Sequence, residues 1–98
     1  MSEDEKIEAL IDAVSRTKDV TFIRNGSEYN ASAAAQLMQY KWNRDRRQIK
    51  TARDFVRVAG TKSSTTGRIY EVRLKVGRVV SSEEFLMGKL AEIEGTRR

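Results

Sequence analysis

A short β-branched run that ends in Asn-Gly constrains the fold of this chain more than any other feature. Residues Val20–Arg24 have the composition of a strand, and Asn25-Gly26 follow them directly. Both turn residues tolerate the positive φ that a tight hairpin turn requires, so the pattern predicts a strand that folds back on itself. Glu28-Tyr29 is the expected returning strand. The chain should therefore contain a small antiparallel sheet.

A second strand pair is expected in the C-terminal half. Ile69, Val72 and Leu74 predict a strand, Gly77 predicts a turn, and Val79-Val80 supplies the partner.

Four further segments combine a capping residue with apolar side chains at helical spacing. The expected helices run over about 3–15, from Asn30 or Ser32 to about 42, from Thr51 to about 59, and from Ser81 to about 94. The first helix has the clearest start, because Ser2 with Glu5 three residues later forms a capping box.

This order predicts a single small α+β domain over residues 1–98, with its core in about 3–94 and a tail at 95–98. The elements follow the order helix, strand pair, helix, helix, strand pair, helix, with the helices packed on the antiparallel sheet. The expected core draws on most of these elements: Ile7, Leu10, Ile11, Val14, Phe22, Leu37, Phe55, Val72, Leu86 and Leu90.

The chain has no His and no Cys, and this excludes several kinds of chemistry. A Cys/His zinc site and a thiol nucleophile cannot be built, and the commonest general base is absent. We expect no metal, no cofactor and no enzymatic activity. No apolar run approaches the roughly 20 residues of a membrane span.

Two polar loops at strand ends are the candidate binding features. Arg24 precedes the Asn-Gly turn, where its guanidinium could hold a carboxylate or phosphate through two parallel hydrogen bonds. The loop Lys62–Gly67 is rich in hydroxyls and backbone amides that could hold an anion. Pairing of Arg24 with a nearby Glu, and a plain solvated loop at 62–67, are the structural alternatives.

Basic residues are concentrated in the middle of the chain and suggest a different function. Residues 41–78 hold twelve basic and three acidic side chains, whereas residues 1–40 hold four basic and seven acidic ones. Binding of a polyanion, either nucleic acid or an anionic envelope polymer, is the alternative hypothesis, and a solvated basic surface is the structural one. We do not expect nucleic acid, because no RNA-binding or helix-turn-helix signature is present. The residues that would carry polyanion binding are Arg44, Arg46, Arg47, Lys50, Arg53 and Arg57.

Several motifs together resemble a family of small exported bacterial proteins known only as domain of unknown function 5329. The resemblance covers about residues 6–94. The motifs that carry it are Lys6–Ile11, Val20–Gly26 with Tyr29, Ala34-Ala35, Lys41, Ile49–Ala52 with Phe55, Ser63-Ser64, Gly67 and Tyr70. The polar residues that match the family pattern are Arg24, Asn25, Tyr29, Lys41, Ser63, Ser64 and Tyr70. We expect these residues to form the ligand site.

The resemblance also implies a compartment and a kind of partner. Family members usually begin with a signal peptide, whereas Met1–Glu5 is acidic and has no apolar segment. A mature periplasmic or secreted form is therefore expected, and a cytoplasmic one stays open. The family has no assigned activity, so the expected role is a non-enzymatic binding or accessory module. Its partner would be a cell-envelope component or a polar or anionic ligand.

Overall fold

Helix α1 spans Glu3–Arg16 and begins at the predicted capping box. The computed structural model describes residues 2–59 and 67–95. In it the Glu5 amide donates to Ser2 Oγ at 3.1 Å, and the Ser2 amide donates to Glu5 Oε1 at 2.8 Å. Both bonds satisfy amides that would otherwise lack a partner at the helix start.

The hairpin consists of β1 (Thr21–Arg24) and β2 (Ser27–Tyr29), paired antiparallel. Asn25 has φ 53° and Gly26 has φ 81°, so both turn residues adopt the left-handed conformation that the sequence predicted.

Helices α2 (Ala31–Arg44) and α3 (Ala52–Ala59) follow the hairpin. Asn30, rather than Ser32, caps α2, and its Oδ1 accepts from the Ala33 amide at 2.8 Å. At the start of α3 the Asp54 amide donates to Thr51 Oγ1 at 3.0 Å, as the sequence predicted.

The second strand pair is shorter than expected. It consists of β3 (Glu71–Arg73) and β4 (Val79–Ser81), and α4 (Ser82–Gly95) follows directly. Ile69 and Leu74 lie outside β3, contrary to prediction. Ile69 is 60% exposed, so no burial holds it in the sheet, and Leu74 exchanges backbone hydrogen bonds with Gly77 and Arg78 in the following turn.

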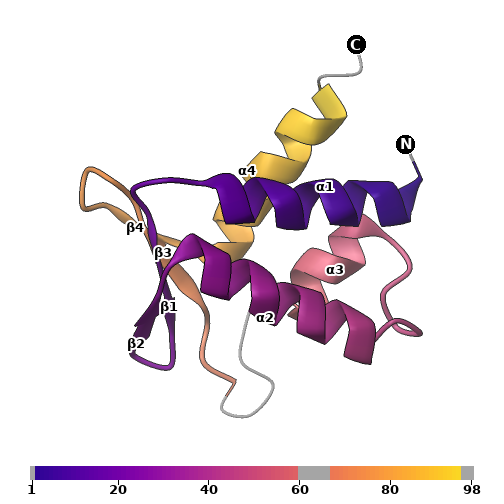
Figure 1. Ribbon diagram of the computed structural model, residues 1–98, viewed down its shortest axis with the longest axis horizontal. Helices are drawn as coiled ribbons and strands as arrows, with labels where there is room; N and C mark the ends of the chain where they lie inside the picture. The colour runs from indigo at the N-terminus through magenta and orange to yellow at the C-terminus, as the bar shows by residue number, and fades with distance from the viewer. Residues whose placement is uncertain (1, 60–66, 96–98) are drawn as a thin grey trace.

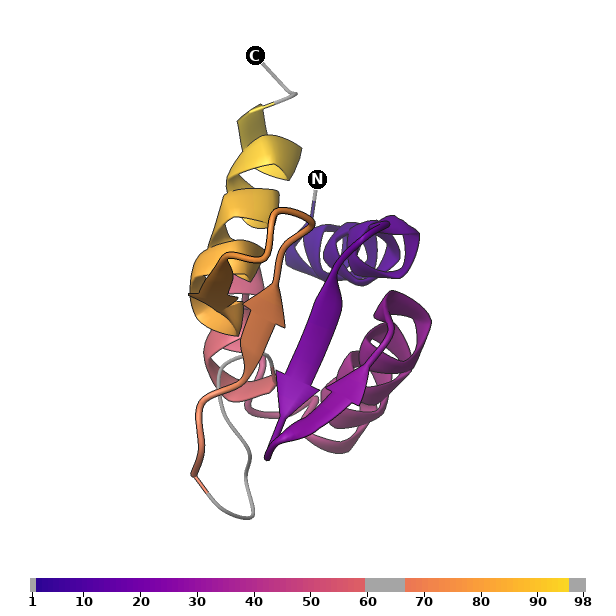
Figure 2. The ribbon, with the colours of Figure 1, turned by 90° about the vertical axis from the view of Figure 1, so that its left-hand side faces the viewer.

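The two strand pairs join into one antiparallel sheet in the order β2-β1-β3-β4. All the helices lie on one side of this sheet (Figures 1 and 2), with α1 and α2 side by side. The architecture is therefore the predicted α+β domain.

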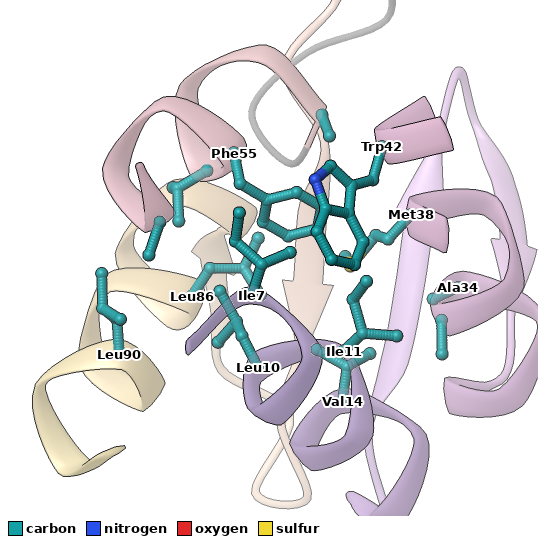
Figure 3. Packing of buried hydrophobic residues seen from close by; sticks show 14 of the residues in the cluster. Ile7, Leu10, Ile11, Val14, Ala34, Met38, Trp42, Phe55, Leu86 and Leu90 are labelled. Carbon is teal, nitrogen blue, oxygen red and sulfur yellow. The ribbon is translucent and has the colours of Figure 1, made fainter. Parts of the chain in front are cut away.

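The core fills the space between the sheet and the helices (Figure 3). Trp42 of α2 and Phe55 of α3 meet edge to face, with ring centroids 6.5 Å apart. Of the ten expected core residues nine are buried, and Leu37 is the exception. Leu37 is half-buried on α2 because it faces a pocket rather than the core. Within the described residues, no helix is long and apolar enough to cross a membrane.

Candidate functional site

The register of the sheet places a row of polar side chains next to a row of apolar ones. Phe22 lies opposite Val72, and Val72 lies opposite Val80, which gives an apolar row across three strands. Side chains two positions apart share a face of a strand. The next row on the same face is therefore Arg24, Tyr70 and Ser82. The Ser82 amide donates to the Tyr70 carbonyl at 2.8 Å, so the register continues beyond the ends of β3 and β4.

Tyr70 is the centre of this polar row. Its side chain is buried, and Lys41 from α2 donates from Nζ to Tyr70 Oη. The same Nζ lies 4.5 Å from the centroid of the Tyr70 ring. Lys41 is only 2% exposed, so α2 places a buried amine next to Tyr70 of the sheet.

Arg24 also interacts with Tyr70. Hydrogen bonds to the hydroxyls of Tyr70 and Tyr29 raise the pKa of the Arg24 guanidinium above its ordinary value. Arg24 therefore stays charged, and two cationic side chains, those of Arg24 and Lys41, converge on one phenol.

No acidic side chain among the described residues pairs with these two cations. In residues 2–59 and 67–95, no carboxylate forms a salt bridge with Arg24 or Lys41. Asp45 is bound to Arg44 at 2.8 Å; this bond, and more weakly the charge of Lys41, hold the pKa of Asp45 below its usual value. Glu71 lines the adjoining pocket, but its side chain is exposed. The site carries an excess of positive charge.

Two buried polar atoms of the row have no hydrogen-bond partner within the described part of the chain. They are Arg24 Nε and Ser82 Oγ, and Ser82 is only 1% exposed. The large majority of buried polar side-chain atoms in proteins have a hydrogen-bond partner, so unpaired ones call for an explanation. Both atoms belong to residues that line the same pocket.

The cavity volume of the pocket is about 30 Å³, and the rest of the hollow is open to solvent. This is well below the roughly 300–1,000 Å³ of pockets that enclose a whole drug-sized ligand, so only a small group of a ligand would be enclosed. The wall of the pocket is mostly apolar and is formed by Phe22, Ala34, Leu37, Met38 and Ala59. The polar residues that line it are Arg24, Tyr29, Tyr70, Glu71 and Ser82.

The structure brings four of the seven predicted ligand residues together. Arg24, Tyr29 and Tyr70 line the pocket, and Lys41 joins them through Tyr70. Asn25 does not line the pocket and forms the hairpin turn.

Two predicted ligand residues are not described by the structure, and one pocket residue was not predicted. Ser63 and Ser64 lie outside the described residues. Ser82 is a pocket residue that sequence reasoning missed; its position two residues after Val80 of the second strand pair is the signal that could have found it.

The residues predicted to bind a polyanion are partly neutralised. Arg44 pairs with Asp45 at 2.8 Å, and Arg57 pairs with Asp54 at 2.7 Å. Arg46 stacks on Trp42, with its guanidinium carbon 3.7 Å from the ring centroid. The others, Arg47, Lys50 and Arg53, are exposed. Polyanion binding stays a prediction, with fewer free charges than the sequence suggested.

No group of three or more acidic side chains among the described residues could hold a metal ion. The arrangement is suited to binding an anion through Arg24 and its neighbours.

The comparisons agree with the resemblance seen in the sequence. The model of a family of unknown function (DUF5329) matches residues 1–94. The chain is 35% identical over 68 residues to the uncharacterized protein YfeK of Salmonella typhimurium, an alignment that covers 69% of this chain. The chain spans 57% of the length of that relative. No solved structure gives a significant match.

Proposed function

The chain belongs to the DUF5329 family of unknown function, and we propose that it is a non-enzymatic periplasmic binding module. Its pocket would take the anionic group of a small ligand, such as a component of the cell envelope. The single observation that supports this proposal is the convergence of Lys41 and Arg24 on Tyr70, with no carboxylate of the described residues paired to either cation.

The physical argument starts from the cost of burying charge. A charged side chain removed from water is destabilising unless a partner compensates it. The hydroxyl and ring of Tyr70 compensate Lys41 in part, because both interactions favour a cation. A ligand carboxylate or phosphate would supply the missing negative charge, and the planar Arg24 guanidinium could bind it through charge-assisted hydrogen bonds.

Two parts of the proposal have other support. The periplasmic location rests on the family resemblance. Fractionation of cells that express the natural gene product tests it, and recovery with cytoplasmic markers would contradict it.

The absence of catalysis is proposed because the chain has neither His nor Cys.

Titration of the ¹⁵N-labelled protein with defined anions tests the binding function. Suitable probes are acetate, inorganic phosphate and soluble peptidoglycan fragments, with neutral sugars as controls. We expect chemical-shift changes at the ends of β1 and β3, around Arg24 and Tyr70. Shift changes confined to other surfaces, or none with any anion, would contradict the proposal.

Matched variants show whether the two cations are responsible. Arg24→Gln and Lys41→Met should each weaken binding roughly tenfold to hundredfold, the range for hydrogen bonds to charged groups. The controls Arg78→Gln and Lys18→Met remove equal charges from exposed positions and should leave the affinity unchanged. Equal losses in all four variants would indicate a nonspecific charge effect and would count against the pocket.

A further inference from the structure

The geometry points to a more specific ligand, a small monocarboxylate with an aliphatic body. Its carboxylate would lie in the polar row, and its aliphatic body would lie along the apolar wall. This inference rests on the proposed binding function and adds the chemical class of the ligand. It combines the donors left unused at one end of the pocket with the apolar wall along the rest of it.

Three donors in the polar row are left without an acceptor among the described residues. Arg24 Nε and Ser82 Oγ are buried without a partner among the described residues. Tyr70 Oη accepts from Lys41 and Arg24, both of which can only donate, so the hydroxyl proton of Tyr70 is left to donate elsewhere. Two carboxylate oxygens offer about four acceptor positions, enough for these three donors.

The number of donors favours a carboxylate over a phosphate. Lys41 and Arg24 are positive, and the Glu71 side chain at the pocket is exposed. A phosphate would bring more oxygens than the three donors can satisfy. A carboxylate has two oxygens and matches the donors better.

The side of the pocket formed by α2 determines the orientation that we expect for the bound ligand. Ala34, Leu37 or Met38, and Lys41 recur at intervals of three or four residues, so they share one face of the helix. This face is apolar at Ala34 and becomes cationic at Lys41, about 10 Å further along the helix axis. A carboxylate beside Tyr70 would therefore leave an aliphatic body lying along Leu37 and Ala34.

The position of Leu37 supports a binding pocket rather than a gap in the packing of the core. Leu37 is half-buried and lies outside the buried core, although it is a leucine on the inward part of α2. An apolar side chain in this position gains burial when an apolar ligand covers it.

A homologous series of ligands tests the inference on the unmodified protein. We would titrate acetate, butyrate, hexanoate and octanoate, with 1-hexanol and inorganic phosphate as matched probes. The dissociation constant should fall about fourfold for each buried methylene, which corresponds to about 0.8 kcal/mol. The gain should stop when the chain outgrows the roughly 10 Å of the α2 wall. Hexanol should bind at least tenfold more weakly than hexanoate.

A pair of variants locates the aliphatic body. Leu37→Ser should flatten the dependence of the dissociation constant on chain length. Gln36→Ser alters the neighbouring exposed position of α2 and should keep the dependence. If Leu37→Ser does not fold, the dependence of affinity on chain length in the unmodified protein still tests the inference.

The outcomes separate this inference from the function on which it rests. Phosphate binding at Arg24 and Tyr70 more tightly than hexanoate would overturn the monocarboxylate and keep the binding function. An affinity independent of chain length would do the same. No anion binding at the pocket would overturn both.

Discussion

The substitution Lys41→Met exchanges a buried amine for an apolar side chain of similar length. It removes one positive charge from beside Tyr70 and leaves Arg24 as the remaining cation. Lys41 is 2% exposed and has no salt bridge to a described carboxylate, so its charge is incompletely compensated. Replacement of a buried ion pair by well-packed apolar residues often stabilises a protein by about 1–4 kcal/mol, and Lys41 is buried without such an opposite charge among the described residues.

The net effect should be smaller than the upper end of that range. Tyr70 loses one hydrogen bond, worth about 1–2 kcal/mol, but keeps the one from Arg24. The difference is centred on a gain of about 1 kcal/mol in the free energy of unfolding, with limits of about −1 and 3 kcal/mol. With a urea dependence of about 1–3 kcal/mol per molar, the midpoint should rise by about 0.5 M. The same variant should lose most of its affinity for anions.

Urea unfolding at neutral pH, followed by circular dichroism, measures this gain. Lys18→Met, at an exposed position, is the control and should change stability by less than about 0.5 kcal/mol. A loss of more than about 1 kcal/mol for Lys41→Met would refute the reasoning. It would show that the amine stabilises the fold, and the argument that it is held for a ligand would fail.

Three further predictions concern the scaffold, each measured by urea unfolding. Leu10→Ala, at a fully buried position, should cost about 2–5 kcal/mol, and a loss below about 1 kcal/mol would mean that α1 does not pack as described. Asn30→Ala removes the cap of α2 and should cost about 0.5–2 kcal/mol, whereas Asn30→Gly should cost only a few tenths. The Glu3 carboxylate accepts from the Ala52 amide at 2.9 Å, and this bond, with Lys6, holds the pKa of Glu3 below 4.5. Its contribution is therefore present above about pH 4.5 and lost as the pH falls through the lower folded-state value. Glu3→Gln should be less stable than wild type at neutral pH and converge with it in acid; a constant difference would contradict this.

The parts of the fold that could be predicted from the sequence are those determined by neighbouring residues. The capping box at Ser2 and Glu5 and the turn at Asn25-Gly26 involve residues at most three positions apart, and the structure confirms both. The joining of the two strand pairs could not be predicted, because the contact between Phe22 and Val72 leaves no local pattern.

The candidate site was predictable in part for the same reason. Arg24 was predicted as a ligand residue because it precedes the Asn-Gly turn. The family resemblance predicted Tyr29, Lys41 and Tyr70. That Lys41 reaches Tyr70 depends on how α2 crosses the sheet, which spacing along the chain does not determine. Leu37 was assigned to the core because helical periodicity does not distinguish a core-facing side chain from one that faces a pocket.

The pairing of β1 with β3 also bears on how fast the protein folds and unfolds. Phe22 and Val72 are 50 positions apart in the chain, so their contact requires the closure of a long loop. Local contacts cost less loop-closure entropy, so we expect this pairing to form late, after the helices and the hairpin. Arg24 and Tyr70 meet only through this pairing, so the pocket would not exist in the transition state. A bound ligand should then slow unfolding and leave the folding rate almost unchanged, because it stabilises interactions formed after the barrier.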